Sequence, residues 1–340
     1  MTHLAAVIPE AKAPLVVKEV DTPQPGPNEV LIKNELIALA PIDAKIAKLG
    51  IFPIKYPGIL GGAYGGTVAA VGAGVTSLKV GDKVAASKSL SSGDNHAAFQ
   101  QYVLSRDVTA SKVPDGSDLH GPVGLIGNFT TVLGLFNAYA GLERPDLSGK
   151  APSRGKKVLV YGGTSSFGSL AVQYAAQAGY DVVTTTSPRH KELTSNLGAV
   201  RVVDHTQGHD AVLKELLAEG PYELVVDSIS LPQTFAITGD VLAAQGGGEI
   251  YALLPAFEPG KFPKGVTAKF ESWSVVLQDE EHAELLKWGF GTYFPKAVAE
   301  DKLVSLPVQK VGGGLGGLNE AIDILIKGVS GVKVVVHPWE

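Results

Sequence analysis

The sequence predicts an α/β protein of two domains, one irregular and β-rich, the other built on a doubly wound parallel sheet. The chain has 340 residues, of which 45% are hydrophobic, and this length is typical of two domains rather than one. Short β-runs interrupted by Gly and Pro fill residues 1–124. Apolar runs then alternate with helical stretches over 125–272, a rhythm typical of parallel strands joined by helices.

Each predicted element has its own pattern. In the first domain "NEVLIKNELIAL" and "GGTVAAVGAGV" indicate strands, and "PIDAKIAKLG" indicates a helix. The strands of the second domain are expected in "KKVLVYG", "YDVVTTT", "AVRVVDH", "YELVVDS", "GEIYALL" and "VTAKFES". The tail predicts helices in "DEEHAELLKWGFGTYFPKAVAEDKL" and "GLNEAIDILIKG" and a strand in "VKVVVHP". We expect this tail to close onto the first domain.

Composition limits the partners. A net charge of −5 and the lack of a Lys/Arg-rich block argue against nucleic acid and membrane surfaces, so a small molecule is expected. The absence of cysteine excludes disulfides, thiolate nucleophiles and cysteine-based zinc sites. The first residues lack the features of a secretion signal and no long apolar run occurs, which predicts a cytoplasmic protein. The Gly- and Ser-rich stretch 87–99 predicts a mobile rim beside a cleft.

A glycine-rich turn follows the first strand of the second domain. In "GGTSSFG", the first two glycines permit a tight turn and the last permits close packing of helix against strand. Because the start of the following helix carries partial positive charge, the segment predicts a pyrophosphate site. A threonine replaces the second glycine of the usual motif, so the alternative is a purely structural turn. The cofactor-binding residues predicted here are Gly162, Gly163, Thr164, Ser165, Ser166, Phe167 and Gly168.

The end of the second strand indicates which dinucleotide is bound. Sites that prefer NAD usually place a carboxylate there, whereas "TTTSPRHK" has none before Glu192. Ser187 and Arg189 can donate hydrogen bonds to a 2′-phosphate, and Lys191 adds a nearby positive charge. The predicted cofactor is therefore NADPH. The alternative is that Arg189 and Lys191 are solvated charges at a helix start.

Several stretches resemble one family along nearly the whole chain. They are "PGPNEVLIKNELIALAPIDAKI", "YPGILGGAYGGTVAAVGAGVTSLKVGDKVAA", "AAFQQYVL", "GKKVLVYGGTSSFGSLAVQYAAQAGYDVV", "LGAVRVVDH", "VVDSI" and "GLNEAIDILIKGVSGVKVVV". The sequence resembles the medium-chain dehydrogenase/reductase superfamily, in its zinc-free quinone oxidoreductase and enoyl reductase branch, nearest the fungal trans-acting enoyl reductases. The resemblance implies a GroES-like catalytic domain from 1–124 and 273–340 and a Rossmann NADPH-binding domain from 125–272.

The departures from the zinc-bearing relatives carry chemical information. Where those relatives have a cysteine and a His-Glu pair, this chain has Ala40, Gly62 and Ala63. The structural four-cysteine site is also absent, and no histidines stand at metal-ligand spacing in the sequence, so no metal is expected. Alcohol oxidation needs a Lewis acid to lower the pKa of the alcohol. The sequence therefore argues against a zinc alcohol dehydrogenase.

What remains is an NADPH-dependent reductase that transfers hydride to an activated C=C bond or a quinone. The resemblance implies that main-chain groups near Ala252 and Leu253 fix the nicotinamide carboxamide, and that Asp227, Ser228 and Ile229 pass beneath the ring. His205 stands where related reductases often place a tyrosine against the 2′-phosphate. The alternative for His205 is a partly exposed histidine at a strand end.

Three residues are candidates for the substrate side: Asp43, Tyr64 and Thr131. A phenol can donate a proton while it stays neutral at pH 7, so Tyr64 is the first candidate donor, and Thr131 has counterparts beside the nicotinamide ribose in relatives. The alternatives are that Tyr64 is a packed residue and that a water donates the proton.

Two other functions fit the same sequence. One is a trans-acting enoyl reductase that serves a polyketide synthase, and the other is a protein that binds NADPH without turnover. A homodimer through the sheet edge of the nucleotide domain, with "VTAKFES" as the edge strand, is a further expectation.

Overall fold

The structure is a computed structural model that describes residues 1–52, 54–88, 92–148, 151–256 and 261–340. Residues 89–91 of the predicted rim lie outside this description. The described residues form two compact units, which we treat separately: unit 1 is Met1–Thr130 with Leu277–Glu340, and unit 2 is Thr131–Val276. Both chain ends belong to unit 1.

Unit 1 is mainly antiparallel β-structure. Among the described residues it has a sheet in the order β2-β1-β4 and a larger one in the order β15-β16-β3-β5-β6-β8, with β7 paired to β3. The long strand β3 buries both faces and pairs with β5, β7 and β16, so it forms the centre of the unit. The strands are β1 Thr2–Ile8, β2 Val16–Asp21, β3 Glu29–Ala38, β4 Gly58–Ile59, β5 Ala63–Val71, β6 Lys83–Ser87, β7 Tyr102–Arg106, β8 Ala110–Lys112, β15 Val308–Val311 and β16 Lys333–Val336.

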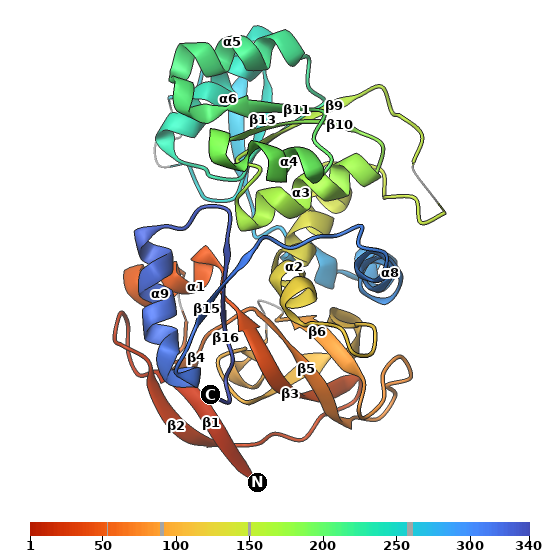
Figure 1. Cartoon of the computed structure of the whole chain (residues 1–340), viewed down its shortest axis with the longest axis vertical. Coiled ribbons are helices and arrows are strands. Elements are labelled where there is room, and N and C mark those ends of the chain that lie inside the picture. Colours follow the sequence, from red (N-terminus) through yellow and green to blue (C-terminus); the bar gives the residue numbers. More distant parts are fainter. Residues whose placement is uncertain (53, 89–91, 149–150, 257–260) are drawn as a thin grey trace. The chain divides into compact units, whose positions relative to one another are not determined.

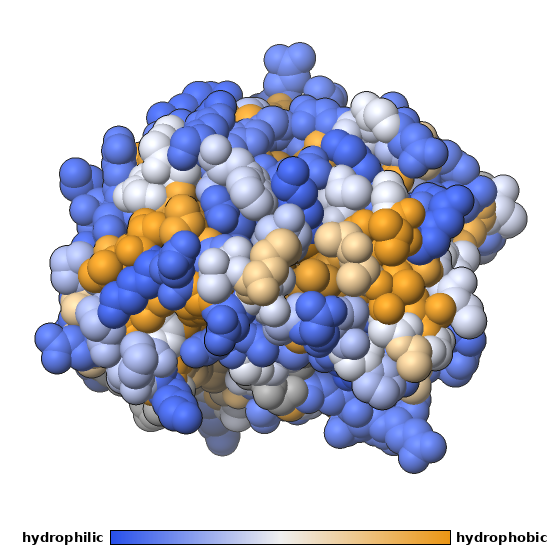
Figure 2. Space-filling view, turned by 90° about the horizontal axis from the view of Figure 1, so that it is seen from below, coloured by the Kyte–Doolittle hydropathy of each residue, from blue (hydrophilic) through white to orange (hydrophobic). Residues whose placement is uncertain are grey.

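The helices of unit 1 come from both ends of the chain. They are α1 Pro41–Leu49, α2 His120–Val132, which ends just inside unit 2, α7 Ala283–Trp288, α8 Phe294–Ala299 and α9 Leu318–Lys327. Helix α9 lies beside α1, and the Lys48 ammonium bonds to Asp323 at 2.7 Å (Figure 1). One core cluster holds residues of β1, β3, β5, α9 and β16 together. The end face in Figure 2 mixes hydrophilic with hydrophobic residues.

Unit 2 is a doubly wound parallel sheet. Its strands follow the order β11-β10-β9-β12-β13-β14 among the described residues, and neighbouring strands in this order run parallel. Valine-rich strands β9 and β12 are central and buried, as expected of strands covered on both faces. The strands are β9 Lys157–Tyr161, β10 Asp181–Thr186, β11 Arg201–Asp204, β12 Leu224–Asp227, β13 Gly248–Ala252 and β14 Val266–Phe270.

Helices surround this sheet (Figure 1). They are α3 Ser166–Gln177, α4 Lys191–Asn196, α5 His209–Glu219 and α6 Pro232–Ala244. The predicted α/β class, with a GroES-like β domain and a Rossmann-type parallel sheet, is confirmed. No helix in the described part of the chain is long and apolar enough to cross a membrane.

Candidate functional site

The turn after β9 is built on three glycines. Gly162 has φ +89°, and a Cβ there would lie 2.7 Å from the Ser228 Oγ. A Cβ on Gly168 would lie only 2.2 Å from the Gly162 carbonyl oxygen, so helix α3 touches the turn at this point. Ser165 caps the helix, because its Oγ accepts from the Gly168 N–H at 2.9 Å. The turn therefore presents the N-terminal end of a helix at the carboxyl edge of the sheet, which suits a pyrophosphate.

The ends of β10 and β11 lie side by side, since Thr186 pairs with Asp204. Ser187 follows β10, and in the described part of the chain its buried Oγ has no hydrogen-bond partner. Arg189, Lys191 and His205 follow the same two strands and are exposed. The Asp204 carboxylate is used locally, because it accepts from the Thr206 N–H at 2.8 Å and the Thr206 hydroxyl at 2.7 Å. This edge thus offers hydrogen-bond donors and cations.

At the end of β12, Asp227 organises a loop. Its fully buried carboxylate accepts from Ile229 N–H at 3.0 Å, Ser230 N–H at 2.8 Å and the Thr234 hydroxyl at 2.6 Å. Burial raises the pKa of Asp227 to about 6, although these donors oppose the shift. Ser230 in turn accepts from the Leu253 N–H at 2.8 Å through its Oγ. Asp227 therefore acts through its loop, which ties the ends of β12 and β13 together.

These features fit a dinucleotide. The glycine turn has no room for side chains, and the unpartnered Ser187 Oγ, within the residues that the structure describes, is a polar atom that a ligand phosphate would satisfy. The main chain at Ala252 was expected to bind the nicotinamide carboxamide. Its carbonyl oxygen, however, already accepts a hydrogen bond from the Trp273 Nε1–H at 2.8 Å. Ser228 also has a local role, donating to the Tyr161 carbonyl at 2.6 Å.

In unit 1, positions 40, 62 and 63, where zinc ligands are expected in zinc-bearing relatives, lie at or near the ends of paired strands and carry no metal-binding side chain. Ala63 pairs with Ala38 on one side and with Ser87 on the other. Gly62 directly precedes β5, and Ala40 stands two residues after the end of β3. Their side chains offer no donor atom to a metal. Within the described residues no group of three or more His, Cys, Asp or Glu side chains is placed to hold a metal ion.

Instead, a charged cluster occupies this end of the sheet. Asp43, in the first turn of α1, is buried and accepts from the Ala40 N–H at 2.8 Å. Val335 pairs with Ala38, so the same register sets the buried Lys333 opposite Ala40. Burial raises the pKa of Asp43 to about 6, against the effects of the Ala40 N–H and of the Lys333 and Lys88 ammonium groups. Burial likewise lowers the pKa of Lys333 to about 8. Burial thus shifts both pKa values toward neutrality.

Tyr64 is not placed to donate a proton to a substrate, which corrects the expectation for it. Its side chain is fully buried in the core of unit 1, and its hydroxyl donates to the Leu104 carbonyl at 2.9 Å. Burial raises its pKa further above the ordinary value. A tyrosine on a central strand packs inward, and this packing takes up the hydroxyl. Thr131 is half-buried in α2, at the first position of unit 2.

Comparison with known proteins identifies the family. Residues 26–140 match the model of the alcohol dehydrogenase GroES-like domain. The chain is 32% identical to the dehydrogenase azaJ of Aspergillus niger, over 98% of this chain and 99% of that protein. It is 33% identical to the trans-enoyl reductase himH of Aspergillus japonicus, over 91% of this chain and 89% of that protein.

The chain belongs to the medium-chain dehydrogenase/reductase superfamily. Within this superfamily it falls in the zinc-free quinone oxidoreductase and enoyl reductase branch, and it is an oxidoreductase that uses a nicotinamide cofactor and a small-molecule substrate. Its fold also matches the quinone oxidoreductase from Coxiella burnetii, with a TM-score of 0.69, 21% identity and coverage of 98% and 99% of the two chains.

Sequence reasoning missed three residues that take part in these candidate sites. Ser230 and Thr234 complete the Asp227 loop, and Lys333 faces Asp43. A lysine at the start of the apolar run "KVVV" is a signal that could have indicated a buried charge with a partner. The positive φ of Ser230, +56°, could not be predicted from the sequence, because serine is common in loops of every conformation.

Proposed function

We propose that this protein is an NADPH-dependent, zinc-independent reductase that transfers hydride to an activated C=C bond or a quinone. One observation supports the proposal most strongly. The end of β10 carries the buried Ser187 Oγ, unpartnered within the described residues, and the exposed cations Arg189 and Lys191, with no carboxylate before Glu192. Such a set suits a 2′-phosphate, and it lacks the carboxylate that usually accepts a hydrogen bond from a free 2′-hydroxyl.

Three segments of unit 2 would bind different parts of the cofactor. The turn Gly162–Gly168 and the start of α3 would receive the pyrophosphate, and Ser187, Arg189, Lys191 and His205 would receive the 2′-phosphate. The Leu253 region, fixed by Ser230, would orient the nicotinamide carboxamide. Bound NADPH supplies a hydride from its nicotinamide ring.

The acceptor follows from the charged cluster of unit 1. A C=C bond conjugated to a carbonyl takes a hydride at its β-carbon and a proton at its α-carbon or oxygen, so it needs a proton source but no metal. With Tyr64 engaged in the core, Asp43 is the candidate to hold that proton, and Lys333 and Lys88 stabilise its carboxylate after release. Thr131 stays a candidate for contact with the bound cofactor.

A more specific function is favoured by the relatives' names. Several proteins with about the identity given above are named trans-enoyl reductases, among them himH and the tndF protein of Aspergillus flavipes. This chain would then reduce an enoyl group delivered by a polyketide synthase. A kcat/KM for a carrier-bound enoyl thioester at least tenfold above that for the free thioester would support this function.

A homodimer through the edge strand β14 and a cytoplasmic location stay predictions.

The cofactor assignment is tested with a charge reversal and a matched control. Arg189→Glu should weaken NADPH binding at least tenfold, measured by fluorescence titration, and leave NADH binding within twofold. Lys264→Glu is the control, because this exposed lysine precedes β14 at the opposite end of the sheet and should change neither affinity. Equal NADPH affinity in wild type and Arg189→Glu would overturn the assignment.

A further inference from the structure

Two histidines far apart in the sequence face each other in unit 1. His120 begins α2 and His337 follows β16, 217 residues later. Their Nε2 atoms are 3.3 Å apart, and the ring centroids are 5.3 Å apart with a 66° angle between the planes. The two histidines are far apart in the sequence, and the fold brings them together.

The outer nitrogens of both rings are already used. His120 Nδ1 bonds to the Asp118 carboxylate, and the His337 ring bonds to the backbone of Glu35. Because the His337 Nε2 faces His120, the bond to Glu35 is assigned to Nδ1, where the ring donates to the carbonyl. A neutral imidazole has one N–H and one lone pair. When both rings are neutral, the two Nε2 atoms present lone pairs to each other, and this repulsion is relieved only by a proton or a metal ion between them.

The separation of the two nitrogens fits a metal ion. Zinc binds histidine nitrogens at about 2.0–2.1 Å in tetrahedral geometry, so two such nitrogens on one ion stand about 3.3–3.4 Å apart. A carboxylate that accepts from the outer N–H, as Asp118 does for His120, is the usual support of a metal-binding histidine. The two rings therefore have the spacing and the orienting partners of a metal-binding pair.

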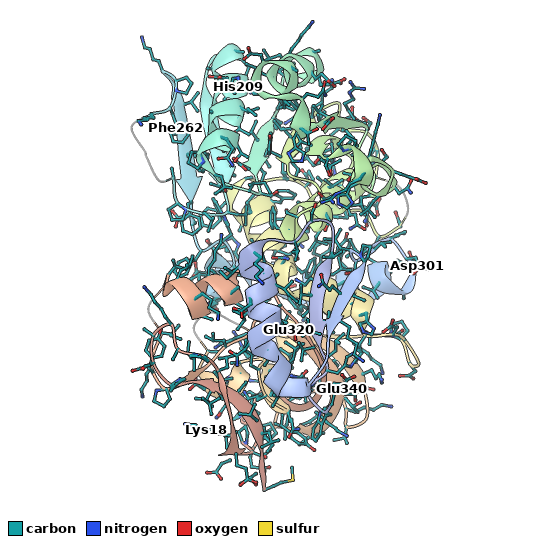
Figure 3. The ribbon with its side chains drawn as sticks, turned by 60° about the vertical axis from the view of Figure 1, so that its left-hand side comes forward. Lys18, His209, Phe262, Asp301, Glu320 and Glu340 are labelled. Atoms are coloured by element: carbon teal, nitrogen blue, oxygen red, sulfur yellow. The ribbon has the colours of Figure 1, made fainter. Side chains whose placement is uncertain are left out.

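We propose that His120 and His337 bind a divalent transition-metal ion through their Nε2 atoms, with water in the other positions. The site is distinct from positions 40, 62 and 63, because the register of β16 places His337 beside position 36 of β3. Lys310 is the nearby cation that opposes a metal ion, and its ammonium bonds to the Glu340 carboxylate at 2.5 Å. Glu340 is labelled in Figure 3, at the end of the same terminal segment. The ion would join the start of α2 to this segment.

The test is zinc binding by the full chain after treatment with a chelator, measured by competition with a chromophoric chelator at pH 7. Wild type should bind one equivalent of Zn²⁺, and His120→Gln or His337→Gln should weaken binding at least tenfold. Asp118→Asn should weaken it about tenfold, as expected for an orienting carboxylate. His209→Gln is the matched control, because this exposed histidine of α5 (Figure 3) also contacts carboxylates, those of Asp210 and Asp240, and should bind zinc like wild type.

A spectrum gives a second readout that does not depend on affinity. One equivalent of Cu²⁺ should show two nitrogen ligands by electron paramagnetic resonance in wild type, and one in His120→Gln. His120 is at the partly exposed start of a helix, so this variant should keep the wild-type circular dichroism spectrum even if His337→Gln does not fold. Equal zinc affinity in wild type and His120→Gln would overturn the proposal. So would a copper spectrum without two nitrogens in wild type.

Discussion

Two buried aspartates at strand ends, one in each unit, have the same raised pKa but different surroundings. Asp227 ends β12 of unit 2, and Asp43 stands just after β3 of unit 1, and burial raises the pKa of each to about 6. Asp227 is held by neutral donors from its own loop, the N–H groups of Ile229 and Ser230 and the Thr234 hydroxyl. Asp43 accepts from the Ala40 N–H and faces two lysines.

The difference separates a structural acid from one that can take part in chemistry. The donors around Asp227 are neutral and fix the shape of its loop, whereas Lys333, whose pKa burial lowers to about 8, acts on Asp43 through its charge. Unit 2 therefore uses its acid to shape the loop that ties the end of β12 to β13. Unit 1 instead keeps its buried acid near two lysines at the end of its sheet.

The largest expected effect contrasts two glycines, one at each of these sheet ends. Gly168→Ala puts a Cβ against the Gly162 carbonyl, and it should lower the free energy of unfolding by about 3 kcal/mol and weaken cofactor binding about 100-fold. Gly62→Ala is the control, since within the described residues a Cβ there meets no atom closer than 4 Å. Thermal unfolding and fluorescence titration measure both. Similar losses in the two variants would break the contrast.

The second effect concerns Asp227 and is a change in how the free energy of unfolding depends on pH. A folded-state pKa above the ordinary value of 3.8 means that Asp227 makes the native state lose stability as pH rises through about 4 to 6. Asp227→Asn lacks this loss, so its free energy of unfolding should rise relative to wild type by about 2–3 kcal/mol between pH 4 and pH 7. Urea unfolding across this range measures it. A difference that does not change with pH would contradict the shift.

The acid of unit 1 should affect turnover instead. Asp43→Asn keeps an oxygen that can accept from the Ala40 N–H but removes the proton, so kcat should fall about tenfold with NADPH affinity unchanged. Lys333→Met should lower kcat as well and move its pH profile, because the remaining carboxyl loses a stabilising cation. Steady-state kinetics from pH 5 to pH 8 measures both. An unchanged kcat in Asp43→Asn would show that Asp43 only caps helix α1.

The smallest effect concerns Tyr64. Tyr64→Phe removes the donor to the buried Leu104 carbonyl and should lower the free energy of unfolding by about 1 kcal/mol. It should leave kcat unchanged, because the hydroxyl belongs to the core. A tenfold loss of kcat, with stability preserved, would return Tyr64 to the list of proton donors.

Local patterns explain what could be predicted from the sequence. The strands of unit 2 have the expected positions because each is a short apolar run between helices, and the Gly162–Gly168 turn follows the first of them. The absence of an acid after Thr186 was also visible in the sequence, and the structure adds that the Ser187 Oγ is buried.

Contacts between distant segments could not be predicted in this way. The charge of Lys333 acts on Asp43, and His337 contacts His120, only because the last strand of the chain pairs with β3. Tyr64 was misjudged for a related reason. The sequence places it among glycines, but only the pairing of β5 with β3 shows that it points into the core.

The most direct test of the central claim follows the absorbance of reduced nicotinamide while the purified protein meets a panel of enones and quinones. We expect at least one acceptor to be reduced with NADPH, with kcat/KM at least tenfold higher than with NADH, and chelator treatment to leave the rate unchanged. Binding of NADPH without turnover of any acceptor, or equal rates with NADH, would contradict it.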